Sequence, residues 1–260
     1  MSDKEKVRSN LQTYKRIPPR ILRGKMPVES FALNGKTYRL EKILKQDFFA
    51  ATGRYVGPAG ADGKPEKAVL KHYHTEPWLG IWLEWTGIAM CKREVRHYRL
   101  LQDLEGIPKL LGRVGKSAFA HAWVEGDDLL DVKDVVPDDF FDRLEALLGA
   151  IHDRGMAYVD MNKPDNVLVG PGGQPFLIDF QISYLAGPRC GRIRRRILAA
   201  LQREDMYHIR KLKRKIRRDL MTPEEIENSY RRSRLLRFHR LFGAPLRDLR
   251  RKILDHLKAR

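Results

Sequence analysis

The strongest constraint in this sequence is a pair of polar loops in its second half, each next to a short apolar run. Residues 158–166, the first polar loop, read Tyr-Val-Asp-Met-Asn-Lys-Pro-Asp-Asn, and residues 177–183, the second polar loop, read Leu-Ile-Asp-Phe-Gln-Ile-Ser. Pro171-Gly172-Gly173 lies between them and predicts a short β-hairpin. Because a hairpin brings its ends together, we expect oxygen-bearing side chains of both loops to face one shared ion.

These loops carry side chains suited to holding magnesium and orienting a hydroxyl group. Asn166 offers an amide oxygen and Asp179 a carboxylate, and both are ligands that Mg2+ accepts. Asp160 follows a β-like run, where a carboxylate that orients an attacking hydroxyl is expected. The alternative is a plain hairpin with ordinary Asp and Asn residues in its turns, which leaves the combination of residues unexplained.

The order of the expected elements indicates the fold class. β-like runs dominate the first half, beginning with a hairpin around Asn34-Gly35, the strongest two-residue hairpin signal. Helical periodicity follows over 77–104, from Pro137 and from Ile193. Thr222-Pro223-Glu224-Glu225 is a capping box that predicts a new helix start. Strands first and helices later predict an α+β fold with two lobes.

Positive charge is concentrated toward the C-terminus. The formal net charge is +18, and residues 185–260 contain 24 Lys and Arg against 8 Asp and Glu. This imbalance favours a polyanionic partner such as phospholipid, lipopolysaccharide or nucleic acid, with a solvated helical surface as the alternative. We expect the apolar stripes of 193–220 to pack on the protein. Residues 231–260 suit packing on the protein and binding to an anionic membrane surface equally well. Nucleic acid is the weaker choice, because no interleaving of aromatic and basic residues suggests base stacking.

Composition argues against a membrane-spanning or disulfide-rich class. No apolar run is long enough to cross a bilayer, and residues 1–10 are polar, unlike a secretory signal. Cys91 and Cys190 match no zinc or redox spacing, which is typical of a reducing compartment. We therefore expect a cytoplasmic protein, either free or peripheral at the inner face of the membrane.

A candidate ion pair lies in the first half of the chain. Lys71 ends the apolar run Ala68-Val69-Leu70, and Glu94 lies within the helix expected over 77–104. A strand lysine paired with a helix glutamate would hold its ammonium group on nucleotide phosphates. Either residue alone is more often a surface charge, so their order relative to the polar loops is what supports the pair.

Lys71, Glu94 and the two polar loops together resemble the protein-kinase-like superfamily over roughly residues 36–220. Within it, the chain is most similar to small bacterial lipopolysaccharide-kinase (Kdo/heptose kinase) type proteins. The resemblance implies ATP and Mg2+ as cofactors, a small β-rich N-lobe and a mainly helical C-lobe. It implies Asp160 and Lys163 as catalytic residues, Lys71, Glu94, Thr52, Gly53, Ala122 and Val124 as nucleotide-binding residues, and Asn166 and Asp179 as metal ligands.

The first polar loop departs from the family by one residue. Five residues separate Asp160 from Asn166, whereas the family has four. Aligned without a gap from Asn166, Met161 would take the position of the base, and the protein would be inactive. We expect a one-residue insertion instead, because Lys163-Pro164-Asp165-Asn166 keeps the family pattern.

Three further departures concern backbone and substrate platform. Residues 46–53 contain one glycine, Gly53, and are expected to cover the phosphates as a loop without the family's G-x-G-x-x-G. Gln181 replaces the glycine that usually follows Asp179-Phe180, which changes backbone freedom there. No Ala-Pro-Glu follows the second polar loop, so little platform is expected for a peptide substrate.

The implied organisation is a flexible basic arm over 1–30, an N-lobe over 31–125, a C-lobe over 126–220 and a basic helical extension over 221–260. We expect a phosphotransferase acting on a non-protein hydroxyl, with a lipopolysaccharide core sugar as the expected kind of acceptor. Two alternatives stay open. One is a pseudokinase scaffold for an anionic membrane or nucleic acid, and the other is a serine/threonine protein kinase.

Overall fold

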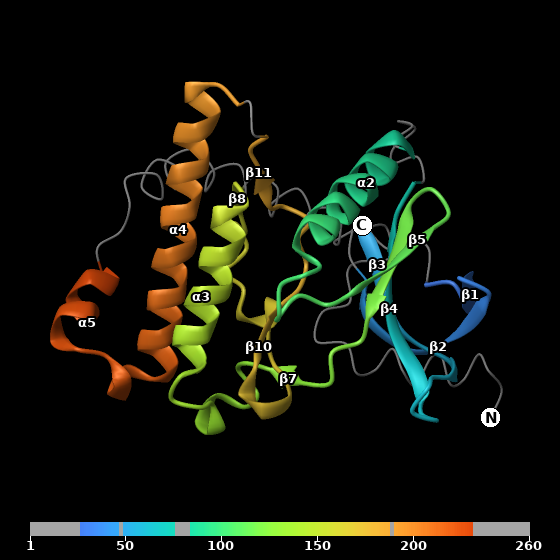
Figure 1. Ribbon diagram of the computed structural model, residues 1–260, viewed down its shortest axis with the longest axis horizontal. Coiled ribbons are helices and arrows are strands. Elements are labelled where there is room, and N and C mark those ends of the chain that lie inside the picture. The colour runs from blue at the N-terminus through green and yellow to red at the C-terminus, as the bar shows by residue number, and fades with distance from the viewer. Residues whose placement is uncertain (1–26, 47–48, 76–83, 188–189, 231–260) are drawn as a thin grey trace, which may run out of the picture. The chain divides into compact units, whose positions relative to one another are not determined.

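The computed structural model describes residues 27–46, 49–75, 84–187 and 190–230. It is a mixed α/β structure with a curled antiparallel sheet and several helices (Figure 1). Contacts within the chain divide it into two compact units, residues 1–102 with 108–124, and residues 103–107 with 125–260. Each unit buries apolar side chains of its own.

The first unit is built on an antiparallel sheet. Its strands are β1 (Ser30–Leu33), β2 (Lys36–Gln46), β3 (Ala50–Ala59), β4 (Pro65–Tyr73), β5 (Leu110–Val114) and β6 (Ala118–Ala122). They are arranged in the order β1-β2-β3-β4-β6-β5, so the first four strands form a meander and the last two a hairpin. The meander sets Lys71 and the residues of β3 beside each other in neighbouring strands.

The first hairpin forms where the sequence predicts it. Asn34 and Gly35 join β1 to β2 with φ angles of 52° and 74°, and Leu33 pairs with Lys36 across the turn. A two-residue turn of this kind needs left-handed backbone at both central positions, which Asn and Gly adopt at low cost. The prediction of a hairpin at this site is confirmed.

The two faces of this sheet bury different residues. One face carries the cluster Phe31, Tyr38, Tyr55, Ala68, Leu70, Ala118 and Ala120. Helix α2 (Glu84–Leu101) packs against β4, β5 and β6, and its Tyr98 ring lies 5.4 Å from Phe119 and 5.3 Å from His121. Successive strand residues point to opposite faces, so Lys71 lies on the side opposite Leu70, facing α2.

The second unit is mainly helical. Its helices are α3 (Phe140–Asp153), α4 (Arg192–Ile216) and α5 (Pro223–Tyr230), with single 3-10 turns η2 (Lys133–Val135), η3 (Pro164–Asn166), η4 (Pro171–Gly173) and η5 (Arg218–Leu220). Its strands are β7 (Asp127–Asp128), β8 (Met156–Ala157), β9 (Val167–Val169), β10 (Pro175–Leu177) and β11 (Tyr184–Leu185). They form two small sheets, β10-β9-β7 and β11-β8.

Two helix boundaries differ from the sequence expectation. The helix expected over 77–104 is α2, which ends at Leu101, and residues 76–83 lie outside the described part of the chain. The helix expected from Pro137 begins at Phe140. The carbonyl of Pro137 accepts a hydrogen bond from the N–H of Phe140 (3.1 Å), so a tighter turn precedes the helix proper.

Helices α3 and α4 lie side by side and form the core of this unit (Figure 1). The core-facing residues of α3 are Phe140, Phe141, Leu144, Leu147, Leu148 and Ile151. In α4, Ile209 and Leu212 are buried, as expected for stripes that pack on the protein. The first stripe differs from that expectation, because Ile193 and Ile197 are 74% and 44% exposed.

The capping box predicted at Thr222 is confirmed. The Thr222 hydroxyl accepts from the Glu225 N–H (3.2 Å), and the Glu225 carboxylate accepts from the Thr222 N–H (2.7 Å). These two bonds satisfy backbone donors that the start of α5 would otherwise leave unpaired. Among the described residues, no helix combines the length and apolar character needed to cross a membrane.

Candidate functional site

The first polar loop folds so that three polar side chains meet. The Asp160 carboxylate is nearly buried, and its Oδ2 accepts from Lys163 Nζ (2.7 Å) and from Asn166 Nδ2 (3.0 Å). Two successive backbone turns compact this segment, since Lys163 N–H donates to Asp160 O (3.0 Å) and Asn166 N–H to Lys163 O (3.1 Å). These turns include the five residues between Asp160 and Asn166. Met161 is buried, and Asp160 is the residue in contact with Lys163 and Asn166.

The start of this loop is held by a carboxylate that the sequence analysis missed. Asp205 of α4 is fully buried and accepts from the N–H groups of Tyr158 (2.8 Å) and Val159 (2.7 Å). Its Oδ2 also lies 3.0 Å from Nε2 of His152 in α3. Hydrogen bonds to an ionised acceptor are roughly twice as strong as neutral ones, so Asp205 fixes the loop firmly.

A sequence signal for Asp205 exists. It is spaced four residues after Leu201 and four before Ile209, in the middle of an otherwise apolar helical stripe. A carboxylate on a buried stripe requires buried donors, and here the donors are backbone N–H groups of a distant loop. The pattern identifies a buried acid, whereas its partners follow only from the tertiary structure.

Val159 has a backbone conformation that matches this tight anchoring. Its φ is 71°, in the left-handed region that β-branched residues rarely adopt. Such strain costs on the order of 1–3 kcal/mol and persists where the surroundings over-determine the backbone. The hydrogen bond from Val159 N–H to Asp205 Oδ1 is one such constraint. It holds the backbone of Val159 in place and therefore sets the direction in which the chain continues to Asp160.

The second polar loop is tied to the first through the predicted hairpin. β9 and β10 pair with Val167 opposite Leu177, and Ile178 N–H donates to Asn166 O (3.1 Å). Asp179 therefore directly follows Ile178, the residue whose backbone is hydrogen-bonded to Asn166. Asp179 also has a positive φ, 63°, which turns the chain sharply at this carboxylate. The expectation that the hairpin brings these two loops together is confirmed.

Tyr158 adds a second connection between the loops. Its hydroxyl donates to the Ile178 carbonyl, and its own carbonyl accepts from Ser183 Oγ (2.9 Å). Its ring meets that of Phe180 edge-on at 5.3 Å. Tyr158, Phe180 and Ser183 are fully buried, so the polar side chains of both loops rest on a packed base.

The donor set fits a magnesium ion. The Asn166 Nδ2 amide group donates to Asp160, which leaves the Asn166 amide oxygen as the atom suited to a cation. Asp179 supplies a carboxylate. No cluster of three or more His, Cys, Asp or Glu suited to a metal occurs among the described residues. Mg2+ commonly uses one or two carboxylates together with water and phosphate oxygens, so a sparse protein donor set is sufficient.

In the first unit, Lys71 and Glu94 form the expected ion pair. Lys71 Nζ lies 3.1 Å from Oε1 and 2.9 Å from Oε2 of Glu94, and the Tyr73 hydroxyl donates to the same carboxylate. Glu94 is fully buried and Lys71 nearly so. A buried pair of charges gives little net stability because both must lose their hydration. Such a pair is better explained by a functional need for the lysine.

The expected phosphate-covering loop of residues 46–53 is wrong in its extent. β2 continues through Gln46 and β3 begins at Ala50, so the connection is short, and residues 47–48 lie outside the described part of the chain. Thr52 and Gly53 belong to β3, opposite Lys71 and Leu70 respectively. The sheet register decides this, because the apolar run after Phe49 continues the ladder with β4.

Thr52 and Gly53 therefore have different roles from those of loop residues. Thr52 lies directly across from Lys71, so its side chain is on the same face of the sheet as the ammonium group. Gly53 is required by packing, since a Cβ there would lie 2.7 Å from Cδ1 of Leu40. Of the two, Thr52 is the candidate for contact with phosphate.

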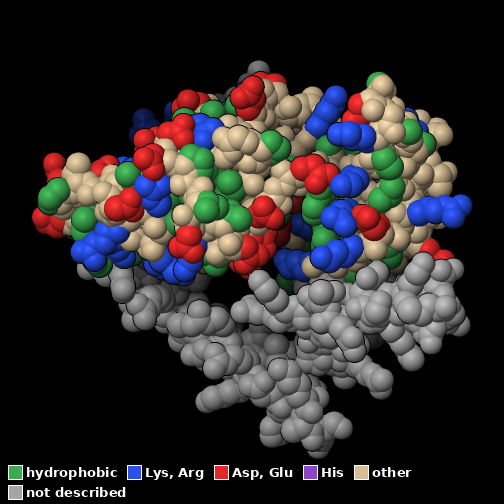
Figure 2. Space-filling view, turned by 90° about the horizontal axis from the view of Figure 1, so that it is seen from below, with side chains coloured by type: hydrophobic (Ala, Val, Ile, Leu, Met, Phe, Trp, Pro, Cys, Tyr) green, Lys and Arg blue, Asp and Glu red, His purple; other side chains and the backbone are tan. Residues whose placement is uncertain are grey.

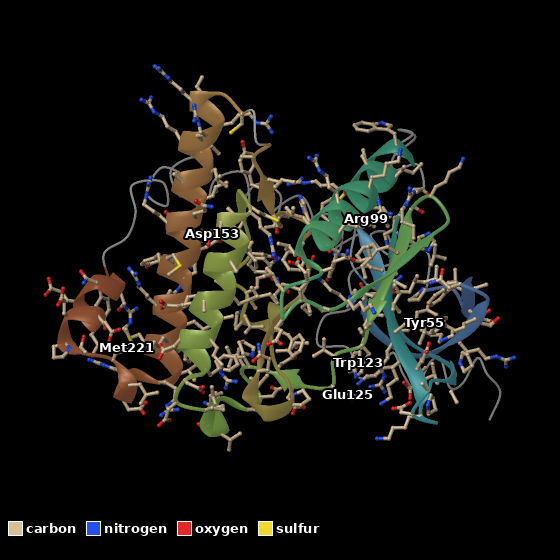
Figure 3. The ribbon with its side chains drawn as sticks, viewed as in Figure 1. Tyr55, Arg99, Trp123, Glu125, Asp153 and Met221 are labelled. Atoms are coloured by element: carbon tan, nitrogen blue, oxygen red, sulfur yellow. The ribbon has the colours of Figure 1, made fainter. Side chains whose placement is uncertain are left out.

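Ala122, the last residue of β6, and Val124 were expected to bind the nucleotide. Ala122 N–H already donates to Lys109 O (2.8 Å), whereas the described residues provide no hydrogen-bond partner for the backbone of Val124. The Trp123 ring, labelled in Figure 3, is covered by the Arg54 guanidinium at 4.9 Å. Of the two expected residues, Val124 is consequently the better candidate for binding a nucleotide through its backbone, and Arg54 packs on Trp123, the residue before it.

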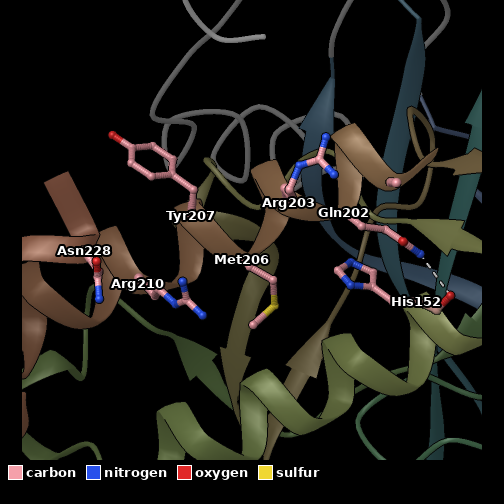
Figure 4. A pocket seen from close by; sticks show the side chains of 8 residues that line it. His152, Gln202, Arg203, Met206, Tyr207, Arg210 and Asn228 are labelled. Atoms are coloured by element: carbon pink, nitrogen blue, oxygen red, sulfur yellow. Dashed lines mark hydrogen bonds between the residues drawn. The ribbon is translucent and has the colours of Figure 1, made fainter. Parts of the chain in front are cut away.

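A groove of about 740 Å³ lies among α3, α4 and α5 of the second unit (Figure 4). His152, Gln202, Tyr207 and Asn228 are among its lining residues. Gln202 Nε2 donates to the His152 carbonyl at 3.0 Å. Because the His152 ring also contacts Asp205, one wall of the groove is joined to the anchor of the first polar loop.

No protein-family model and no curated protein matches this chain. Function is therefore inferred from two groups of residues. Asp160, Lys163, Asn166 and Asp179 belong to the second unit, and Lys71 with Glu94 to the first. The carboxylate and amide oxygens of the group in the second unit can bind a hard cation and accept a proton. The buried lysine of the first unit can neutralise an anion.

Proposed function

We propose that this chain is an ATP- and magnesium-dependent phosphotransferase of the protein-kinase-like type, acting on a hydroxyl acceptor. The observation that carries the proposal is the arrangement around Asp160, whose buried carboxylate accepts hydrogen bonds from Lys163 and Asn166. These contacts form although five residues, one more than the family has, separate Asp160 from Asn166. A carboxylate positioned in this way can accept the proton of an attacking hydroxyl. We further propose that the two units correspond to the N-lobe and the C-lobe of that fold.

Each residue would contribute by positioning and charge, which is how phosphoryl transfer is mainly catalysed. ATP with Mg2+ supplies the transferable γ-phosphoryl group and neutralises part of its charge. Lys71, oriented by Glu94, would bind phosphate oxygens, and Asn166 and Asp179 would hold the cation. Asp160 would orient the acceptor hydroxyl and take its proton as the new P–O bond forms and ADP leaves. Lys163 would stabilise the charge on the transferred group.

A non-protein acceptor is supported by the short segment after the second polar loop. β11 pairs with β8 directly after Ser183, and α4 begins at Arg192, so the described residues there build no extended platform for a peptide. A sugar hydroxyl of lipopolysaccharide type is the acceptor we propose, and serine/threonine peptides are the alternative to be excluded.

Transfer of labelled γ-phosphate by the purified full chain tests this proposal, with lipopolysaccharide, a serine/threonine peptide pool and water as acceptors. We expect Asp160→Asn to lower turnover by about 100-fold or more, the usual contribution of a positioned base. Asp165→Asn is the matched control, since Asp165 is exposed and lies in the same loop. It should leave turnover near that of the unchanged protein.

The outcomes separate the alternatives. Equal turnover in the Asp160→Asn and Asp165→Asn variants would contradict the role given to Asp160. Efficient labelling of peptides would favour a protein kinase. Absence of nucleotide binding would favour a binding module that keeps the fold without the reaction.

A further inference from the structure

The first two turns of α4 are unusual in their exposure. Every residue from Arg192 to Ile197 is exposed, whereas from Leu198 onward the helix has a buried side. We call residues 192–197 the basic stub. In Figure 1 this end of α4 extends beyond the neighbouring end of α3. Apolar burial therefore contributes little to holding the stub helical.

The cations of the stub differ from those near the other end of α4. There, Lys213 contacts Asp142 (3.1 Å), and Arg217 contacts Asp138 (2.6 Å) and Asp219 (2.9 Å). The face drawn in Figure 2 shows Lys and Arg side chains interspersed with Asp and Glu. In the stub, Arg192, Arg195 and Arg196 have no acidic partner among the described residues, and Arg194 contacts only the Tyr184 hydroxyl (3.4 Å).

The position of these arginines in the helix is electrostatically unfavourable for the isolated protein. The N-terminal end of a helix carries partial positive charge and favours acidic residues, yet the first turn of α4 has none. Four arginines within five positions also repel one another. Both costs are removed when a polyanion covers the stub, so its charge pattern fits an anionic partner.

The exposed isoleucines identify the kind of polyanion. Ile193 and Ile197 are spaced one turn apart and therefore lie on the same side of the helix, with arginines flanking them. Nucleic acid offers no apolar surface of this kind, whereas a bilayer offers acyl chains beneath anionic headgroups. We propose that the basic stub docks the protein on an anionic membrane surface, with Ile193 and Ile197 inserted among the lipids.

Such docking would deepen the proposed function without depending on it for its own test. β11, which precedes α4, pairs with β8, which leads into the first polar loop, with Tyr184 opposite Ala157. A membrane held by the stub would thus be linked through one small sheet to the segment that carries Asp160. This favours an acceptor hydroxyl carried by a membrane amphiphile, and that part rests on the proposed phosphotransfer.

Co-sedimentation of the full chain with vesicles, in the absence of nucleotide, tests the docking. Phosphatidylcholine vesicles with and without phosphatidylglycerol serve as probes. We expect binding only to the anionic vesicles. The triple variant Arg194→Gln, Arg195→Gln, Arg196→Gln should weaken that binding about 100-fold, since each cation near such a surface contributes about a fivefold factor. The double variant Ile193→Ser, Ile197→Ser should weaken it more than tenfold.

A matched triple variant controls for net charge. Lys211→Gln, Lys215→Gln, Arg218→Gln removes three exposed cations from the other half of the helical region and should weaken binding far less. Equal losses in the two triple variants, or equal binding to neutral vesicles, would overturn the proposal. So would binding to a DNA duplex that needs the arginines and tolerates the Ile193→Ser, Ile197→Ser change. Circular dichroism of each variant verifies that its fold is retained.

Loss of vesicle binding is distinguishable from failure of the phosphotransferase. The basic stub contains none of the residues assigned to the reaction, so the variants should retain ATP hydrolysis with water as acceptor. Vesicle binding without any turnover would support the docking and count against the enzyme, and turnover without vesicle binding would do the reverse.

Discussion

Asp205 is the single residue on which the geometry of the first polar loop depends most. Its carboxylate is fully buried, accepts hydrogen bonds from two backbone N–H groups and contacts His152. It lies on a different element from Asp160 and is separated from it in sequence, so its influence on that residue is through the backbone of Tyr158 and Val159. Asp205 is a positioning residue and needs no contact with substrate.

Asp205→Asn should destabilise the protein by about 3 kcal/mol, because an amide cannot accept from all three donors and leaves buried N–H groups unpaired. Urea unfolding measures this change. Turnover should fall in the folded fraction while nucleotide binding persists, since the Asp160 loop loses its fixed direction. Asp153→Asn, at an exposed carboxylate on α3, is the control and should change neither quantity. Unchanged turnover in a destabilised Asp205→Asn protein would restrict Asp205 to a structural role.

The residues of the candidate site were predictable from sequence to different degrees. Asp160, Lys163 and Asn166 could be grouped by their spacing, because short turns bring near neighbours together. Lys71 and Glu94 could be named, but their contact depends on how α2 packs against β4. Asp205 was missed because its partners are distant backbone groups, which no sequence pattern specifies.

Among the elements, α5 has the clearest local signal. Thr222 and Glu225 form reciprocal hydrogen bonds at its first turn. We expect Thr222→Ala to reduce the free energy of unfolding by about 1 kcal/mol, the usual cost of losing such a cap. Thr222→Ser should retain most of it, because the hydroxyl is kept. Urea titration compares the three proteins, and equal losses in both variants would show that the hydroxyl is not responsible.

Helix α4 carries a group whose titration should be visible in stability. Burial, assisted by the charge of Lys211 and opposed by that of Asp205, lowers the pKa of His208 from its usual 6.5. The unfolded chain therefore binds a proton more readily than the folded protein just below that pH. Stability should fall as the pH is lowered through about 6.5, and remain steady above it.

His208→Gln removes this titration and tests its assignment. Unfolding free energies of the two proteins would be compared at about pH 8 and about pH 5.5. The unchanged protein should lose more stability than the variant between these values. An identical loss in both would show that other groups account for the pH dependence.

Element boundaries show where local signals end. The local sequence Asn34-Gly35 was sufficient to predict the first hairpin, because two left-handed residues in the turn determine the register of both strands. Residues 46–53 were expected as a loop because of their family position, whereas pairing of Thr52 and Gly53 with β4 makes them strand. The stripe at Ile193 and Ile197 was expected to pack, but both side chains are exposed.

For the molecule as a whole, the sequence indicated an α+β chain with strands before helices. The structure is a mixed α/β fold compatible with that class, and strands β1 to β4 do precede α2, but α2 and α3 alternate with the later strands. Its division into two units follows from tertiary contacts, with the short segment 103–107 belonging to the second unit although it lies between elements of the first. The assignment of this segment to the second unit depends on the packing of a few residues, which no periodic pattern in the sequence indicates. The proposed reaction requires the chain to bind ATP together with Mg2+.

Binding of ATP in the presence of magnesium, measured as a shift in thermal unfolding, tests this requirement most directly. A ligand at about 100 times its dissociation constant stabilises a protein by about 2.7 kcal/mol. We predict a clear upward shift with ATP and Mg2+, a much smaller one without Mg2+, and loss of the shift in both Lys71→Met and Asp179→Asn. Asp153→Asn should retain it. No shift in the unchanged protein, or a full shift in both site variants, would contradict the account.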